Sequence, residues 1–195
     1  MKINSYILLA LIILLSFTNC KSTKGISIVQ NKNNVNIAKD MEIVAIDKSP
    51  FSFYFKLKKY TENTPEVAKL AAFSNKNDLD ALQIGLNINQ TKCFDKGDAL
   101  ALRPITGYDA LFIVDYGFHA LYYDNPEDKS VELLSEKDGM ADVAFHVNRL
   151  FTNEKYIEIT EYELSEIYVA LFIDTNYNET IDEGELTKFT IQFKN

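Results

Sequence analysis

The sequence of 195 residues has no tryptophan and few glycines (7), prolines (4), cysteines (2) and histidines (2). The scarcity of glycine and proline excludes collagen-like and low-complexity chains. Two cysteines cannot form a disulfide scaffold or a four-thiolate zinc site. Basic residues are outnumbered, 20 to 28, and the resulting net charge of −8 argues against binding to nucleic acid. Since the chain is 47% hydrophobic and 12% aromatic, we expect it to fold around a core.

Residues 1–19 are predicted to be a signal peptide. Lys2 is the only charged residue before Cys20, and Tyr6 to Leu15 form an unbroken apolar run. As a helix, these ten residues would span about 15 Å of a hydrocarbon core about 30 Å thick, so the run is too short for a transmembrane helix. A basic start followed by a short apolar run is typical of a signal peptide.

The stretch Leu15-Ser16-Phe17-Thr18-Asn19-Cys20 comes directly after this run and resembles the lipobox of bacterial lipoproteins. In that family, cleavage precedes a cysteine that carries diacylglycerol and an N-acyl chain, which implies lipidation of Cys20. Three acyl chains are enough for stable anchoring. Phe17 and Asn19 depart from the family, which usually has Leu and a small residue there. The alternative is an ordinary secretory signal with a chance cysteine.

The lipobox resemblance implies a location in the bacterial cell envelope. Lys21 is not the aspartate that retains some lipoproteins on the inner membrane. We therefore expect an outer membrane lipoprotein that faces either the periplasm or the cell surface. Residues 20–40 are predicted to be the lipidated cysteine and a polar tether, in which Ile26–Val29 is a candidate edge strand.

Residues 41–195 are predicted to form a single domain in which the dominant period is two. Apolar and polar residues alternate in segments 51–58, 84–89, 143–148 and 188–194, which predicts half-buried strands. Leu111–Val114 and Ile167–Ile173 lack alternation and predict central strands. Pro65–Phe73 predicts a helix with Thr64 as its N-cap. The expected fold class is mainly all-β, an antiparallel β-sandwich of about seven or more strands with one short helix.

Excess negative charge is confined to one stretch of the chain. Asn153–Glu185 contains ten acidic residues and one lysine, while the remainder after the signal peptide has 18 acidic and 18 basic residues. A solvated strand face would account for this charge, and so would a bound cation.

Within that stretch, Asp174–Glu185 resembles the twelve-residue calcium loop of EF-hands. That family has oxygen ligands at the first, third, fifth, seventh, ninth and twelfth positions and an aliphatic residue at the eighth, here Ile181. Glu179 takes the sixth position, where the family has glycine, and Tyr177 the fourth, so we expect weak binding. The resemblance implies these Ca²⁺ ligands: side-chain oxygens of Asp174, Asn176 and Asn178, the carbonyl of Thr180, Asp182 directly or through water, and bidentate Glu185.

The segments on both sides of this loop predict strands, so the resemblance is to the loop alone, set in a β-hairpin. The alternative is an acidic hairpin loop that binds no metal. Either way, the loop is the strongest site motif of the sequence.

Motifs for catalysis are missing from the sequence. It has no G-x-S-x-G elbow, H-E-x-x-H, P-loop or dinucleotide-binding glycine motif. His119 and His146 are interpreted as structural residues, and Cys93 as a small buried hydrophobic residue. We expect a non-enzymatic binding or structural module with a protein partner on the envelope. The alternatives are an enzyme or enzyme-inhibitor domain, or an accessory subunit of a secretion or uptake machine.

Overall fold

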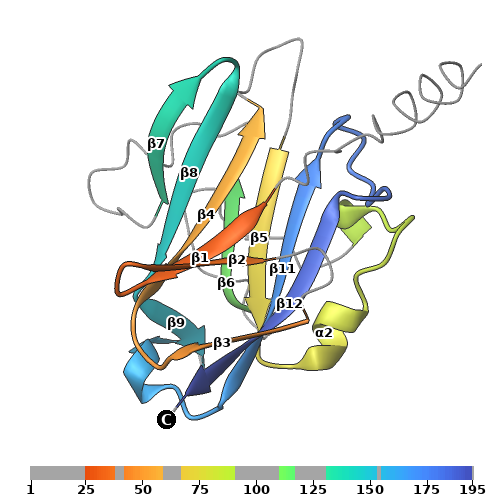
Figure 1. Cartoon of the computed structure of the whole chain (residues 1–195). Helices are drawn as coiled ribbons and strands as arrows, with labels where there is room; N and C mark the ends of the chain where they lie inside the picture. The colour runs from red at the N-terminus through yellow and green to blue at the C-terminus, as the bar shows by residue number, and fades with distance from the viewer. Residues whose placement is uncertain are drawn as a thin grey trace, which may run out of the picture.

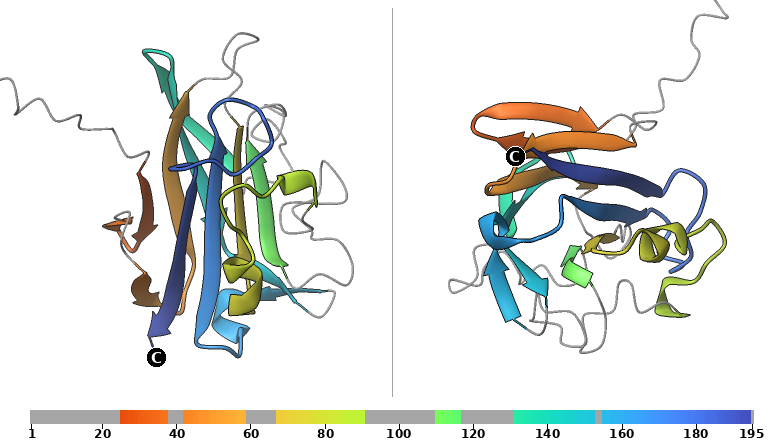
Figure 2. Two further views of the ribbon diagram at one scale, coloured as in Figure 1. Left: turned by 90° about the vertical axis from the view of Figure 1, so that its right-hand side faces the viewer. Right: turned by 90° about the horizontal axis from the view of Figure 1, so that it is seen from below.

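Strands make up most of the described part of the chain in the computed structural model, which describes residues 25–37, 42–58, 67–90, 110–116, 131–152 and 155–194. They form two five-stranded sheets and a two-stranded ribbon, which Figures 1 and 2 show from three sides. The two larger sheets enclose a common hydrophobic core. The predicted all-β sandwich is therefore confirmed. The signal peptide and Cys20 lie outside the described residues.

The first sheet is antiparallel throughout and has the strand order β2-β1-β4-β8-β7. The alternation predicted for β4 is confirmed, because Phe51, Phe53 and Phe55 are buried while Ser52 and Tyr54 between them are half-buried. In β8, Val143, Phe145 and Val147 are buried and His146 is half-buried, but Ala144 is buried as well. Its strands are β1 (Ile26–Gln30), β2 (Asn33–Ile37), β4 (Phe51–Lys58), β7 (Val131–Lys137) and β8 (Met140–Val147).

The segment predicted to be a polar tether contains β1 and β2, so the fold begins well before residue 41. β1 lies between β2 and β4 as an inner strand, and Ile26 and Ile28 are each 1% exposed in the core. The turn between the strands is made by Asn31 and Lys32, both with positive φ. The strand predicted at Ile26–Val29 is therefore confirmed as β1, but it is an inner strand and not an edge strand, and the segment from Ile26 to Ile37 is not a tether. Two buried isoleucines are enough to fill an inner strand, although polar neighbours dominate the composition.

The second sheet has the order β3-β12-β11-β5-β6 and is antiparallel except for the parallel pair of β3 and β12. The run Ile167–Ile173 lies in β11, a buried central strand as predicted. Leu111–Val114 lies in β6, which ends the strand order within the described ranges, so its predicted central position is wrong there. The strands are β3 (Ile43–Asp47), β5 (Val67–Phe73), β6 (Ala110–Tyr116), β11 (Glu166–Asp174) and β12 (Leu186–Lys194).

The helix predicted at Pro65–Phe73 is wrong, because Val67–Phe73 forms β5 between β11 and β6. Both faces of β5 are covered, so its residues show no alternation, and a short buried strand then resembles a helix in sequence. The short helix is instead α2 (Lys76–Asp80), capped by the Asn75 side chain, which accepts the Asn77 N–H at 3.0 Å. The strand predicted at 84–89 is also wrong, since this segment is a turn followed by the 3₁₀ helix η1 (Ile88–Gln90).

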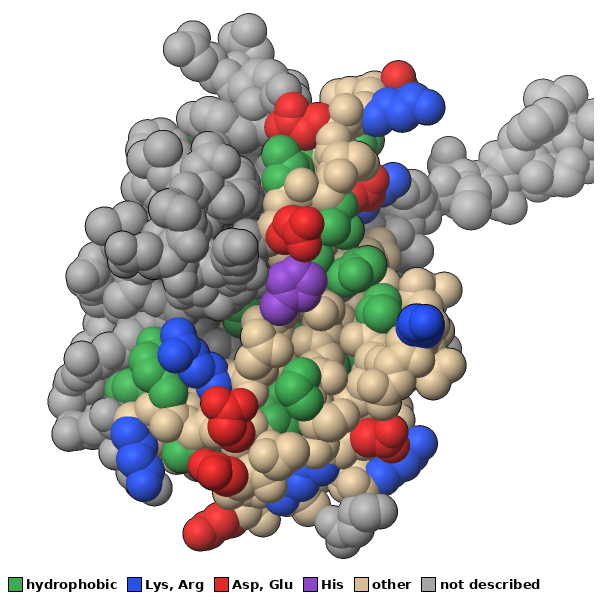
Figure 3. All heavy atoms as spheres, turned by 90° about the vertical axis from the view of Figure 1, so that its left-hand side faces the viewer, with side chains coloured by type: hydrophobic (Ala, Val, Ile, Leu, Met, Phe, Trp, Pro, Cys, Tyr) green, Lys and Arg blue, Asp and Glu red, His purple; other side chains and the backbone are tan. Residues whose placement is uncertain are grey.

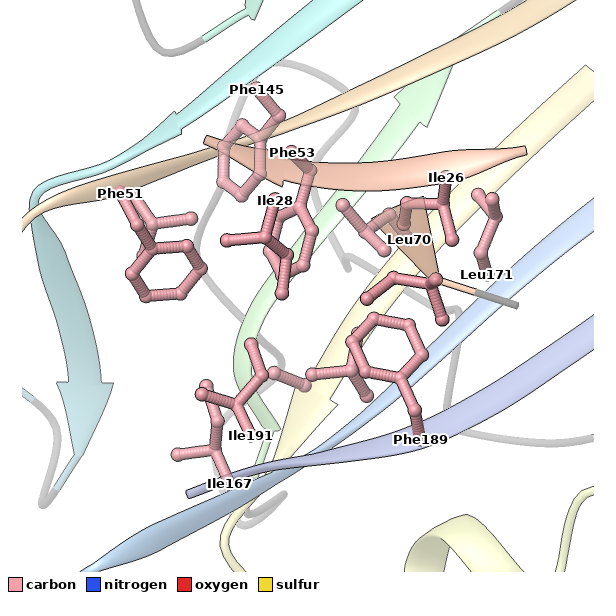
Figure 4. Close-up of a cluster of buried hydrophobic side chains, with 14 of the residues drawn as sticks. Ile26, Ile28, Phe51, Phe53, Leu70, Phe145, Ile167, Leu171, Phe189 and Ile191 are labelled. Atoms are coloured by element: carbon pink, nitrogen blue, oxygen red, sulfur yellow. The ribbon is translucent and has the colours of Figure 1, made fainter. Parts of the chain in front are cut away.

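The main core is centred on Phe53, which is fully buried between the sheets (Figure 4). Its ring centroid lies 6.4 Å from that of Phe145 in the same sheet and 6.2 Å from that of Phe189 on β12. At one end of the core, the buried Gln30 side chain joins the two sheets. Its Oε1 accepts the Asp47 N–H at 2.8 Å and its Nε2 donates to the Asp47 carbonyl at 2.9 Å.

A second hydrophobic cluster covers the outer face of the second sheet. Phe73 of β5 and Phe172 of β11 point away from the main core and pack with Leu79, Leu82, Ile88 and Ile181. The α2 region and the segment up to Gln90 therefore form a third layer on this sheet. The remaining described elements are the ribbon of β9 (Arg149–Thr152) and β10 (Lys155–Glu158) and the 3₁₀ helix η4 (Ile159–Glu161). No helix in the described ranges is long and apolar enough to cross a membrane.

Candidate functional site

The predicted calcium loop, Asp174–Glu185, connects β11 directly to β12. Phe172 pairs with Leu186 in the ladder, and the Ile173 N–H donates to the Glu185 carbonyl at 2.9 Å. Both ends of the loop are therefore fixed by the hairpin. The flanking segments are strands, as the sequence predicts.

The carboxylates at the two ends of the loop are buried. Asp174 is 1% exposed and Glu185 is 5% exposed. Oδ2 of Asp174 accepts the Glu179 N–H at 2.9 Å, and Glu185 Oε1 accepts the N–H and the hydroxyl of Thr175 at 2.7 and 2.6 Å. Glu185 Oε2 accepts the Asp182 N–H at 3.1 Å. The first and twelfth positions of the loop thus point inward, and N–H and hydroxyl donors offset the cost of burying their charge.

The two asparagines fold the middle of the loop. Asn176 Oδ1 accepts the Asn178 N–H at 3.1 Å, and Asn178 Oδ1 accepts the Thr180 N–H at 2.8 Å, so each side chain closes an Asx turn. Their Nδ2 groups both donate to Asp182 Oδ2, at 2.8 and 2.9 Å. The predicted ligand residues therefore share one hydrogen-bond network.

Tyr177 and Glu179 both have a φ of 59°, in the left-handed region. A non-glycine residue pays about 1–2 kcal/mol for that conformation. Glu179 stands at the sixth position, where EF-hand loops make a sharp turn with glycine. The backbone makes a left-handed turn here without glycine, and Tyr177 is 43% exposed.

Thr180 and Ile181 attach the loop to the segment after α2. Thr180 bridges Asn87, and the flanking bonds run from the Ile88 N–H to the Glu179 carbonyl and from the Ile181 N–H to the Leu86 carbonyl, both at 2.9 Å. In such a pair, the N–H and carbonyl of Thr180 point away from Asn87, toward the loop. Ile181, at the eighth position, is fully buried in the second hydrophobic cluster.

The donor set of the loop is made of oxygen atoms, which suits a hard cation such as Ca²⁺. Five acidic residues and no basic residue fall within its twelve positions. Across the described ranges, no three His, Cys, Asp or Glu side chains are grouped so that they could share a metal ion. The carboxylates of Asp174, Asp182 and Glu185 are held instead by N–H donors of the loop. The residue types therefore match calcium chemistry. For Asp182 to bind an ion, the ion would have to replace the Nδ2 groups of Asn176 and Asn178 as partners of its carboxylate.

Sequence reasoning missed a second polar cluster on the outer face of the first sheet. The hydroxyl of Ser52 on β4 and His146 Nδ1 on β8 are 2.8 Å apart, and His146 Nε2 is 3.0 Å from Glu132 Oε2 on β7. Figure 3 shows the histidine, in purple, on this face. His146 is 29% exposed and Glu132 is 58% exposed. The three residues come from three strands, so no local motif in the sequence could predict the cluster.

The same face carries a second chain of cross-strand contacts. The Ser135 hydroxyl donates to Asp142 at 2.7 Å, and Lys56 Nζ lies 3.0 Å from the same carboxylate. The hydrogen bond from Ser135, followed by that from Lys56, holds the pKa of Asp142 below its usual value. Polar cross-strand pairs are therefore a general feature of this face.

Cys20, Cys93 and His119 lie outside the described residues. Comparison with protein-family models, curated proteins and solved structures finds no match to this chain.

Proposed function

We propose that this chain is a lipid-anchored lipoprotein of the bacterial outer membrane that acts as a non-enzymatic binding or structural module with one weak Ca²⁺ site. The observation that supports the calcium site is the loop Asp174–Glu185, with two inward carboxylates at the ends of a hairpin. The lipobox-like stretch before Cys20 supports the anchor.

Charge within the loop favours a cation. Besides Asp174 and Glu185, the loop carries Glu179, Asp182 and Glu183, and like charges this close repel one another. Ca²⁺ accepts six to eight oxygen ligands in flexible geometry, whereas Mg²⁺ requires a tight octahedron that an irregular loop rarely supplies. Extracellular calcium modules work at dissociation constants of roughly 10⁻⁴ to 10⁻³ M, and we expect this loop to bind in that range because its sixth position lacks glycine.

Calorimetric titration of the protein with Ca²⁺ tests the site. We expect one ion to bind in the range given above, and Mg²⁺ to bind more weakly. Glu185→Gln removes the twelfth-position ligand and should abolish binding. Glu183→Gln removes the same charge at the tenth position, which is not a predicted ligand, and should retain it. Equal loss in both variants would show that net charge alone attracts the ion.

Labelling of growing cells with an alkyne fatty acid tests the anchor. The wild-type protein should take up the label and fractionate with membranes. Cys20→Ser should lose the label and be released, while Cys93→Ser, the matched control, should behave as the wild type. Equal labelling of the Cys20→Ser variant would refute lipidation at this residue.

The cluster of Ser52, His146 and Glu132 favours a second candidate, an enzyme of acyl transfer. A hydroxyl within hydrogen-bond reach of a base that is oriented by a third group is the arrangement of an activated nucleophile. In that role, Ser52 Oγ would attack an ester carbonyl, and His146 would take the hydroxyl proton and return it to the leaving alcohol. However, β4 lies between β1 and β8, so the ladder engages its N–H groups and they cannot stabilise an oxyanion.

A fluorophosphonate probe decides between the two candidates. An enzyme would be labelled at Ser52 and lose the label in Ser52→Ala. Ser135→Ala, which removes another hydroxyl from the same face, is the control and should not change labelling. We expect no labelling of any form, because the module we propose needs no nucleophile.

A further inference from the structure

We propose that two copies of this chain associate through β2, an edge strand of the first sheet. In this dimer, β2 pairs antiparallel with β2 of the second copy across a two-fold axis at Val35. The two first sheets then form one continuous sheet. The proposal requires neither the anchor at Cys20 nor the calcium site.

β2 lies at the end of the first sheet within the described ranges. It pairs with β1 on one side, and no described strand pairs with it on the other. In both views of Figure 2, the hairpin of β1 and β2 lies at the rim of the molecule. Three of the five side chains of β2 are exposed, those of Asn33, Asn34 and Asn36. The strand is therefore accessible to a partner.

The turn between β1 and β2 determines which main-chain groups of β2 point outward. The two turn residues have positive φ and form a two-residue hairpin loop between Gln30 and Asn33. In such a turn the N–H of the last residue faces the carbonyl of the first, so the main chain of Asn33 is directed toward β1. Because this direction alternates along a strand, the N–H and C=O groups of Asn34 and Asn36 are directed away from β1. Among the described residues, these four groups have no hydrogen-bond partner.

β2 also lacks the features that usually prevent edge strands from pairing, namely charged residues, proline and bulges. Its sequence is Asn-Asn-Val-Asn-Ile, and its register with β1 is unbroken. The strand at the other end of this sheet, β7, differs in both respects. It carries Glu132, Glu136 and Lys137, and its register with β8 shifts after Leu133. Of these two edges, β2 is therefore the one suited to a further strand.

The symmetry of β2 about Val35 favours a second copy as its partner. In an antiparallel pair centred on Val35, Asn34 of each copy lies opposite Asn36 of the other. These are the two residues with outward main-chain groups, so the pair makes four main-chain hydrogen bonds. A register displaced by two residues would leave only two. Each asparagine side chain has donors and an acceptor, so the opposed amides also match.

Val35 and the lack of charge on β2 favour the same pairing. The Val35 side chain is half-buried and packs against the main core. In a pair of this kind, directly opposite Cβ atoms lie about 4.5–5.5 Å apart, so Val35 of the second copy covers the part that is exposed. The chain has a net charge of −8, but β2 itself has none. Two copies can therefore approach along this strand without local repulsion.

A charge exchange tests the pairing in the full-length protein in detergent micelles, by sedimentation across a dilution series. Asn34→Lys with Asn36→Lys places like charges opposite each other at both pairs, whereas Asn34→Lys with Asn36→Glu places opposite charges there. We expect the dimer dissociation constant of the first variant to be about tenfold higher than that of the second. Overall charge acts in the other direction, because the first variant is less negative. Equal constants, or a wild-type protein that is monomeric at every concentration, would overturn the proposal. Circular dichroism checks that both variants fold.

Oxidative crosslinking tests the register in a Cys93→Ser background. Val35→Cys lies opposite its own copy across the axis and should form a dimer linked by a disulfide. Asn33→Cys, the matched control on the same strand, lies about 13 Å along the strand from its copy and should stay monomeric. The Cys93→Ser parent shows any crosslinking through Cys20. Equal crosslinking at positions 33 and 35, or none at 35, would refute antiparallel pairing about Val35.

Discussion

Tyr162 has a buried hydroxyl without a hydrogen-bond partner among the residues that the structure describes. Its side chain is 4% exposed, and its ring packs edge-on against Phe193, with centroids 6.3 Å apart. Burial raises the pKa of Tyr162 well above the ordinary tyrosine value near 10, and the neighbouring Tyr168 contributes a smaller increase. The hydroxyl is thus a cost to folding that the packing of the ring outweighs.

We expect Tyr162→Phe to keep the ring contacts and to leave the free energy of unfolding unchanged or raise it by about 1 kcal/mol, because an unpaired buried donor disappears. The unfolded chain loses the tyrosine proton near pH 10, whereas the folded chain retains it. Wild-type stability should therefore fall as the pH rises above about 10, and fall less in the variant. Urea unfolding at neutral and alkaline pH measures both effects.

Tyr168→Phe is the control for this substitution, since its hydroxyl donates to Glu166. It should be neutral or slightly destabilising at neutral pH. A clear loss of stability in Tyr162→Phe would contradict the prediction and indicate that the Tyr162 hydroxyl has a partner in the folded protein.

How far single residues can be predicted depends on their separation in sequence. The six predicted calcium ligands fall within one loop because they are at most eleven residues apart, although their ion binding stays a prediction. Ser52 and His146 are 94 residues apart and meet only through the pairing of β4 and β8. The left-handed conformation of Glu179 could not be predicted either, because this conformation is usually adopted by glycine. The hairpin imposes it on a glutamate here.

At the scale of elements, β1 is a strand whose inner position was not predicted, and substitutions on its two faces should have different effects on stability. Ile28 is 1% exposed and pairs with Phe53, whereas Val29 is half-buried on the outer face. We expect Ile28→Ala to lower the free energy of unfolding by about 2–5 kcal/mol, because it opens a cavity in the core. Val29→Ala, the matched control, should cost at most about 1 kcal/mol. Equal effects would contradict the placement of β1, and chemical denaturation measures them.

Alternation predicted the strands that have one face toward water, although it failed at 84–89, and of the two covered strands β11 was predicted correctly whereas β5 was predicted as a helix. The alternation in β4, β8 and β12 arises because each has a core face and an outer face. β5 is covered on one side by the main core and on the other by the second cluster, so Ala71 and Phe73 are as buried as Leu70 and Ala72. The resulting apolar run carries no period, and Thr64-Pro65 before it favours a helix start. The strand conformation of β5 is determined by its pairing with β11 and β6, which the local sequence does not show.

At the scale of the whole molecule, the second hydrophobic cluster connects the candidate calcium loop to the fold. Ile181 of the loop packs with Phe172 of β11 and with Leu82 and Ile88 of the segment after α2. Lys188 of β12 donates to the carbonyls of Leu79 and Leu82 at 3.2 and 3.1 Å, which ties the same segment to the sheet. Any stabilisation of the loop should therefore raise the free energy of unfolding of the whole domain.

We expect Ca²⁺ to raise the thermal midpoint of the whole domain. At about 1 mM free Ca²⁺ and a dissociation constant near 10⁻⁴ M, binding to the folded state alone adds about 1.4 kcal/mol of stability. For a domain of this size, that corresponds to a rise of about 3–6 °C in the midpoint. Scanning calorimetry with Ca²⁺ and with a chelator measures the shift. Asp174→Ala combined with Glu185→Gln should eliminate the shift, whereas Glu183→Gln should preserve it. Ile181→Ala should lower the midpoint in both conditions, because it removes a packing contact rather than a ligand. Coincident curves for the wild type would refute the calcium site and leave the acidic hairpin as a structural loop, held by the N–H donors that already engage its carboxylates.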